Sequence, residues 1–213
     1  MSRNRLAHYA QLDAMPHVLA YPENMAGNWH TFFSNSHEIV LELGCGCGEY
    51  TVGLAQLEPH RNYIGTDIKG ARLWHGATNV TNLGLKNAAF LRTRIEQIAD
   101  YFGKDEVAEI WITFPDPQPR ESKEKKRLTN KRFLDYYLTF LKQNGSLHLK
   151  TDDQDLYNYT LELWQQQPNM RIVQATNNLY AQAVSPVLDI KTTFERKWLK
   201  RNLDICYIHA VVG

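Results

Sequence analysis

Short apolar runs rich in β-branched residues alternate with amphipathic segments along most of the chain. The apolar runs cover residues 37–44, 62–68, 88–94, 106–114 and 146–151. The segments that follow them have the lengths and apolar spacing of helices, and they cover residues 49–57, 71–84, 95–102, 130–145 and 155–167. Parallel neighbouring strands need crossover connections, so this alternation predicts an α/β fold with a mostly parallel central sheet and helices on both faces. In the fourth helix, Thr129 or Asn130 can cap the start and Gly145 can end it.

The two ends of the chain depart from this alternation. Residues 170–176 and 203–212 have strand-like patterns, but the segment between them is loop-like and basic rather than a long amphipathic helix. We therefore expect one antiparallel strand near the C-terminus, close to the edge of the sheet. Residues 1–30 are polar and predict a weakly ordered N-terminal arm, which leaves residues 31–213 as the single folded domain.

Composition is that of an ordinary globular protein and excludes several classes. With 213 residues, 43% apolar and 22% charged, the chain can bury one sizeable core and shows no sign of disorder or a coiled coil. No apolar stretch approaches the roughly 18 residues that span a bilayer, and no signal peptide is evident, so we expect a cytoplasmic protein without membrane contact. Cys45, Cys47 and Cys206 fit neither a disulfide framework nor a metal site with a second ligand cluster.

The formal net charge of the chain is +1, but the charged residues are distributed unevenly along it. Residues 120–132 carry seven basic and two acidic side chains, and residues 191–201 carry five basic and one acidic. A single charge run is most often a solvated helix face. Two separate basic segments on a nearly neutral protein favour a polyanionic partner.

A glycine-rich turn follows the first strand, in the pattern Glu42-x-Gly44-x-Gly46-x-Gly48. Glycines let the backbone turn sharply and approach a ligand at the carboxyl end of the sheet, where open α/β folds bind their ligands. The dinucleotide fingerprint would need a glycine where Glu49 stands, and a pyrophosphate would be a poor neighbour for two acids. A nicotinamide-dependent oxidoreductase is therefore disfavoured.

An acid two residues before such a turn suits a cationic ligand without phosphate. S-adenosylmethionine has an ammonium, a sulfonium and a ribose, and Asp67, at the end of the second strand, stands where a carboxylate can accept both ribose hydroxyls. The combination predicts a Rossmann-like methyltransferase. For Glu42 alone, the alternative is a carboxylate that caps a helix or a turn.

A second acid lies between prolines after the fourth strand, in the run Phe114-Pro115-Asp116-Pro117. In a methyltransferase of this fold, that loop borders the acceptor site. Proline fixes its own φ and restricts the residue before it, so Asp116 is held stiffly. The alternative is an exposed turn aspartate.

Five segments taken together resemble the bacterial tRNA (guanine-N7)-methyltransferases. They are "LELGCGCG", "GTDI", "FPDPQPRESKEKKRL", "LKTD" and "TTFERK", in this order, and the resemblance covers roughly residues 25–213. It implies the Rossmann-like class I methyltransferase fold, S-adenosylmethionine as cofactor, tRNA as partner, and methylation of N7 of a variable-loop guanine. It implies neither a metal nor a particular oligomeric state.

The resemblance also assigns roles to individual residues. The cofactor-binding set is Glu42, Gly44, Gly46, Asp67, Arg94 and Asp116, with Asp116 also catalytic. The substrate-binding set is Arg120, Asp152, Thr192, Thr193, Phe194 and Glu195. The RNA-binding run is Ser122, Lys123, Glu124, Lys125, Lys126 and Arg127.

The chain departs from the family pattern at three positions. Gln118 replaces a tryptophan that could stack on a base, Arg120 replaces a lysine, and Arg94 replaces an aspartate near the adenine. Two alternatives stay open: a class I methyltransferase acting on another RNA base, a small molecule or a protein, and an RNA-binding protein whose cofactor site has decayed.

Overall fold

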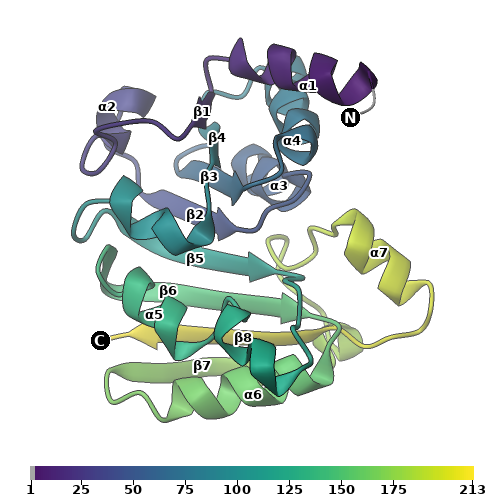
Figure 1. Cartoon of the computed structure of the whole chain (residues 1–213). Coiled ribbons are helices and arrows are strands. Elements are labelled where there is room, and N and C mark those ends of the chain that lie inside the picture. The colour runs from purple at the N-terminus through teal and green to yellow at the C-terminus, as the bar shows by residue number, and fades with distance from the viewer. Residues whose placement is uncertain (1–2) are drawn as a thin grey trace.

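An eight-stranded sheet forms the centre of the molecule (Figure 1). The computed structural model describes residues 3–213, with side chains from His8 onward. Across the sheet the strand order is β1-β4-β3-β2-β5-β6-β8-β7. The strands are β1 (Val18–Ala20), β2 (Ile39–Leu43), β3 (Asn62–Asp67), β4 (Ala88–Arg92), β5 (Val107–Thr113), β6 (Leu141–Thr151), β7 (Met170–Thr176) and β8 (Cys206–Val212).

Parallel pairing dominates the sheet. The pairs β1–β4, β4–β3, β3–β2, β2–β5 and β5–β6 are parallel, whereas β8 runs antiparallel to both β6 and β7. This arrangement confirms the predicted mostly parallel sheet with one antiparallel strand near the C-terminus. Because β2 has β3 on one side and β5 on the other, the carboxyl ends of these three strands are neighbours.

Helices cover both faces of the sheet, as predicted (Figure 1). They are α1 (Arg3–Asp13), α2 (Trp29–Phe33), α3 (Glu49–Leu57), α4 (Gly70–Leu83), α5 (Lys131–Tyr137), α6 (Gln154–Gln165) and α7 (Thr193–Leu199), with 3₁₀ helices η1 (Ile95–Tyr101), η2 (Glu121–Lys126) and η3 (Leu179–Ala181). Successive strand residues point to opposite faces, so Leu41 joins the core under α5 and α6 while Val40 joins the core under α3 and α4.

The expectation of a weakly ordered arm over residues 1–30 is wrong for the residues that the structure describes. β1 pairs in parallel with β4 and extends the edge of the sheet. Leu12 is fully buried in the core under α3 and α4, and Trp29 is fully buried in the core on the other face. The few apolar residues of this polar segment thus occupy specific positions in both cores. The average polarity of residues 1–30 does not predict these positions. Residues 1 and 2 lie outside the described residues.

The predicted helix over residues 130–145 is also wrong in its second half. Asn130 caps α5 as expected, because its side chain accepts a hydrogen bond from the backbone N–H of Arg132. The helix ends at Tyr137, however, and β6 begins at Leu141, so Gly145 lies inside a strand. Pairing between β5 and β6, which starts with Val107 opposite Leu141, outweighs the local helical pattern.

No helix within residues 3–213 is long and apolar enough to cross a membrane.

Candidate cofactor and substrate site

The glycine-rich turn after β2 has the backbone conformation that glycine favours. Gly44, Gly46 and Gly48 have φ values of +69°, +57° and +69°. A Cβ on Gly48 would lie 2.5 Å from the Phe90 ring, so this glycine is required for packing. A Cβ on Gly46 would meet no described atom within 4 Å. The turn therefore presents its backbone to open space at Gly46, where a ligand can approach.

Asp67 contacts this turn directly. Its Oδ2 accepts a hydrogen bond from the Gly46 N–H at 3.0 Å, and its Oδ1 accepts one from the Lys69 N–H at 2.7 Å. Asp67 is the last residue of β3, and the β2–β3 pairing brings it beside the turn. An ionised carboxylate oxygen can accept more than one hydrogen bond, so both oxygens keep capacity for a ligand hydroxyl. The structure thus brings together Gly44, Gly46 and Asp67, which we predicted as cofactor-binding residues.

Glu42 lies beneath the turn rather than on its open side. Only 3% of its surface is exposed. One carboxylate oxygen accepts hydrogen bonds from the backbone N–H (2.9 Å) and the hydroxyl of Thr51, and the other accepts one from the Thr113 hydroxyl at 2.6 Å. Burial raises the pKa of Glu42 to about 7 despite these three hydrogen bonds. These hydrogen bonds link β2, α3 and β5 inside the protein, and the cofactor contact of Glu42 stays a prediction.

Asp116 is exposed in the loop that follows β5. Its Oδ1 accepts a hydrogen bond from the Gln118 N–H at 3.1 Å. Phe114 and Gln118, on either side, have backbone φ values of +48° and +47°. Residues other than glycine rarely adopt such values. The Phe114 N–H donates to the carbonyl oxygen of Lys150 at 2.8 Å, which ties the loop to β6. The loop is therefore constrained on both sides of an available carboxylate.

The other predicted residues occupy different environments. Arg94 is exposed at the start of η1, after β4, and Arg120 is exposed before η2. Asp152 follows β6, and burial raises its pKa. Thr192 caps α7, since its hydroxyl accepts from the Glu195 N–H at 3.1 Å.

Glu195 is fully buried and forms an ion pair with Lys150, with 2.8 Å between Lys150 Nζ and the nearer carboxylate oxygen. Lys150 Nζ also donates to the carbonyl oxygens of Leu188 (3.0 Å) and Ile190 (3.2 Å), and the Tyr180 hydroxyl donates to Glu195 at 2.5 Å. Burial lowers the pKa of Lys150. These contacts anchor Glu195 inside the protein, and its contact with substrate stays a prediction.

Glu49 anchors the start of α7 from the other side. Its carboxylate accepts hydrogen bonds from the Thr193 N–H (2.7 Å) and hydroxyl (2.6 Å), and it pairs with Arg196 at 2.8 Å. Glu49 directly follows the glycine-rich turn, so this contact joins the turn to the segment that carries Thr193 and Phe194. Phe194 itself is 50% exposed. From the sequence, Glu49 served only to disfavour a pyrophosphate ligand. No local sequence pattern predicts its contact with Thr193.

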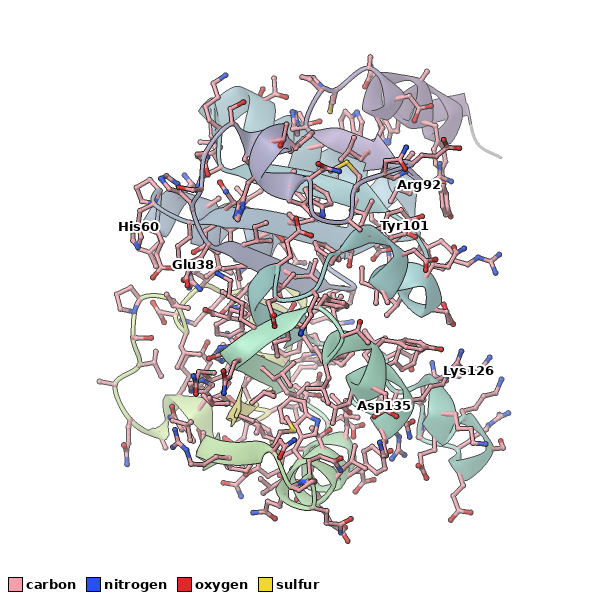
Figure 2. All side chains as sticks on the ribbon, turned by 90° about the vertical axis from the view of Figure 1, so that its left-hand side faces the viewer. Glu38, His60, Arg92, Tyr101, Lys126 and Asp135 are labelled. Atoms are coloured by element: carbon pink, nitrogen blue, oxygen red, sulfur yellow. The ribbon has the colours of Figure 1, made fainter. Side chains whose placement is uncertain are left out.

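Both basic segments lie at the surface. In the RNA-binding run, Ser122, Lys125 and Lys126 are exposed and the other three residues are half-buried. Figure 2 shows Lys126 at the periphery of the molecule. On α7, a hollow of about 440 Å³ is lined by Thr193, Arg196, Lys197, Lys200 and Arg201.

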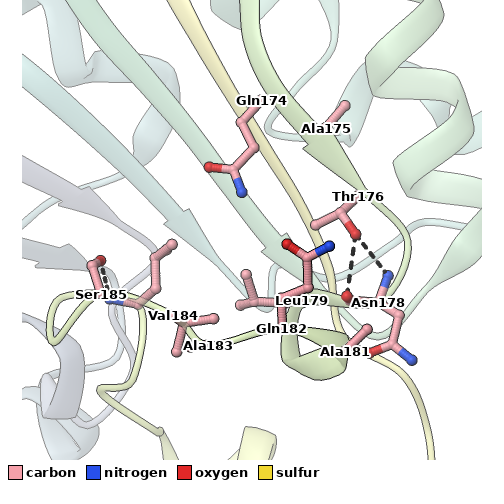
Figure 3. Close-up of a pocket in the computed structure, with 11 residues that line it drawn as sticks. Gln174, Ala175, Thr176, Asn178, Leu179, Ala181, Gln182, Ala183, Val184 and Ser185 are labelled. Atoms are coloured by element: carbon pink, nitrogen blue, oxygen red, sulfur yellow. Dashed lines mark hydrogen bonds between the residues drawn. The ribbon is translucent and has the colours of Figure 1, made fainter.

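A larger pocket of about 500 Å³ lies elsewhere, between β7 and residues 178–188 (Figure 3). Gln174, Thr176, Asn178 and Gln182 contribute polar side chains to its wall. None of the predicted site residues lines this pocket. The candidate site remains the set of loops at the carboxyl ends of β2, β3 and β5.

Two solved structures with a similar fold are methyltransferases. The 16S rRNA methyltransferase KamB superposes with a TM-score of 0.65 and 14% identity, covering 88% of this chain and 93% of that one. An antibiotic-related methyltransferase gives a TM-score of 0.62 and 18% identity, covering 88% and 92%. At these identities the likeness concerns the fold alone, and that fold is the Rossmann-like fold of class I methyltransferases.

Sequence comparison identifies the family. A family model described as "Putative methyltransferase" matches residues 36–208. The tRNA (guanine-N(7)-)-methyltransferase of Bacteroides thetaiotaomicron is 46% identical over 218 residues, covering 98% of this chain and 85% of the relative. The enzyme of the same name from Streptococcus agalactiae is 34% identical over 209 residues, covering 98% of both. The chain belongs to the tRNA (guanine-N(7)-)-methyltransferase family.

Proposed function

We propose that this protein transfers the methyl group of S-adenosylmethionine to N7 of a guanine in tRNA. The observation that carries the proposal is the glycine-rich turn bound to Asp67, beside the constrained loop of Asp116 at the neighbouring strand end. The relatives at 34–46% identity supply the substrate class. The resemblance of the motifs narrows the target to the guanine of the variable loop.

The residues of the turn fit the cofactor. Asp67 would accept hydrogen bonds from the ribose hydroxyls, and the backbone at Gly44 and Gly46 would lie against the ligand, in the open space at Gly46. The negative potential of Asp67 favours a ligand with cationic groups and no phosphate. When bound, S-adenosylmethionine supplies an electrophilic methyl group. Glu42 would support the turn from below, and Arg94 lies at the end of the adjacent strand β4.

Asp116 would orient the acceptor base. Guanine N7 is an unprotonated lone pair, so the reaction requires no general base. A fixed carboxylate that accepts hydrogen bonds from guanine N1–H and N2–H is favoured more as positive charge develops on the purine. At about 5 Å and an effective dielectric constant near 20, one full charge pair contributes about 3 kcal/mol, or roughly a hundredfold in rate, as an upper bound.

The basic segments would hold the tRNA backbone. Lys125 and Lys126 on η2 follow the loop of Asp116, and α7, which carries basic side chains, is joined to Lys150 of β6 through Glu195. Asp152 directly follows β6 and Arg120 directly precedes η2, and both could contact the acceptor nucleotide. We infer a cytoplasmic location from the proposed tRNA substrate.

The decisive experiment is incubation of the full chain with S-adenosylmethionine and unmodified tRNA transcript, followed by nucleoside mass spectrometry. We expect 7-methylguanosine to form. Methylation at another base or only of small molecules would overturn the assigned acceptor. Isothermal titration with the cofactor alone tests the alternative of an RNA-binding protein whose cofactor site has decayed. Such a protein would give no heat of binding.

A further inference from the structure

The basic run on η2 has two sides with different surroundings. Lys125 and Lys126 are exposed, whereas Glu124 and Arg127 are half-buried. The inner side faces α6: the Tyr159 hydroxyl donates to Glu124 at 3.1 Å, and the Asn130 amide donates to the same hydroxyl at 2.7 Å. One short segment thus combines an outer face that can meet phosphates with an inner face that is already bound by protein.

Arg127 connects this inner side to the loop of Asp116. Its Nε donates to the carbonyl oxygen of Pro117 at 3.2 Å, and its Nη2 lies 3.4 Å from the carbonyl oxygen of Gln118. The guanidinium also stacks on the Tyr159 ring, 4.3 Å from its centroid. Three of its interactions are therefore made inside the protein.

These contacts bind the part of the loop whose backbone conformation is unfavourable without neighbouring groups. Gln118 has a left-handed backbone, and its N–H binds the carboxylate of Asp116. Such a conformation persists only where neighbouring groups hold it. The guanidinium fork binds the two successive carbonyl oxygens after Asp116, a geometry that an arginine can match and a lysine ammonium cannot.

We propose that Arg127 is a positioning residue for Asp116 and not a contact to an RNA phosphate, although it lies in the basic run. Its role in turnover rests on the proposed function. Its role in holding the loop does not, because that contact joins residues of this chain alone.

The first experiment measures hydrogen exchange of residues 114–120 in the free full-length protein by mass spectrometry. Arg127→Gln and Arg127→Lys should both accelerate exchange in this loop, whereas Lys126→Gln, the matched change on the outer face, should leave it unchanged. Unchanged exchange in both Arg127 variants would overturn the positioning role, whatever the reaction of the enzyme.

The second experiment measures turnover at saturating tRNA, and tRNA affinity against salt concentration. Arg127→Gln should lower turnover on the order of 10- to 100-fold, as misplacement of a reacting group does, and retain the wild-type salt slope. Lys126→Gln should weaken binding and reduce the log-log slope by roughly 0.7 to 0.9, the contribution of one phosphate. The proposal fails if Arg127→Gln reduces the salt slope of tRNA affinity and leaves turnover at the wild-type value. It also fails if Arg127→Lys has wild-type turnover. Failure of the wild type to methylate tRNA would instead refute the proposed function.

Discussion

Asp116 combines an exposed carboxylate with a backbone that cannot easily move. Prolines at 115 and 117 restrict it from within the chain, and the hydrogen bond from the Gln118 N–H orients the side chain. An acid that binds the edge of a base depends on such preorganisation. Its contribution should therefore appear in turnover.

Replacing Asp116 by Asn keeps the shape of the side chain and removes its charge. Turnover should fall by up to roughly a hundredfold, because the lost interaction strengthens as charge develops on the guanine. Affinity for S-adenosylmethionine, measured by isothermal titration, should change little. Unaltered turnover would show that Asp116 has no role in the reaction.

Glu42 makes folding sensitive to pH. Its pKa is about 7 in the folded protein, against an ordinary value of 4.5. Between these values the folded chain keeps a proton that the unfolded chain has released, so this group makes stability fall as pH rises from about 4.5 to about 7. Above pH 7 its effect is constant.

Glu42→Gln should remove this fall, because glutamine does not titrate. The stability of the variant relative to wild type should rise between pH 4.5 and 7, by at most about 3 kcal/mol. Urea denaturation at a series of pH values measures this difference. Parallel stability profiles for the two proteins would contradict the assignment of the raised pKa to Glu42.

At the scale of elements, α7 is held in place by two acids. Glu49, at the start of α3, binds Thr193 and Arg196, and Glu195 is paired with Lys150 of β6. Only seven residues long, α7 would not be stable without such contacts. Its basic side chains are therefore positioned by the same elements that form the candidate site.

Breaking the buried pair should destabilise the protein strongly. Glu195→Gln leaves the Lys150 ammonium buried without a counter-charge and should cost about 3 to 5 kcal/mol of unfolding free energy. Lys150→Met combined with Glu195→Gln removes both charges and should cost less than the single change. Chemical denaturation at pH 7 compares the two. A double variant at least as unstable as the single one would contradict the charge-burial argument.

At the scale of the whole molecule, a nearly neutral chain concentrates positive charge near the carboxyl ends of its strands. Lys125 on η2 and Lys200 after α7 are both exposed there. Lys104 is exposed before β5, at the opposite, amino end of that strand. Lys125 and Lys200 belong to the two basic segments, whereas Lys104 lies outside both.

Binding of tRNA should be strongly salt-dependent, and Lys125→Gln and Lys200→Gln should each reduce the log-log slope of affinity against salt by roughly 0.7 to 0.9. Lys104→Gln, as the matched control, should leave the slope unchanged. Filter binding or fluorescence anisotropy over a range of salt concentrations measures it. Equal effects of all three changes would indicate unspecific attraction, without a defined tRNA-binding edge.

Sequence alone determined the features that reside in local patterns. Alternating strands and helices, glycines with positive φ at 44, 46 and 48, and the proline-flanked Asp116 all depend on residues close together in the chain. Parallel topology then brought Asp67 to the glycine-rich turn, since both follow neighbouring strands. The fold class therefore followed from the sequence, and so did the proximity of Asp67 to the glycine-rich turn.

Only the tertiary structure decided which charged side chains are exposed and which are bound by other groups of the protein. Glu42, Glu195 and Arg127 stand in motifs that suggested ligand contacts, yet each is bound by protein groups. The partners Thr113 and Lys150 lie 71 and 45 residues away in the chain. Leu12 and Trp29 similarly reach the two cores from a polar segment. Burial depends on contacts between segments that are distant in the chain. The residue pattern of a single segment does not predict these contacts.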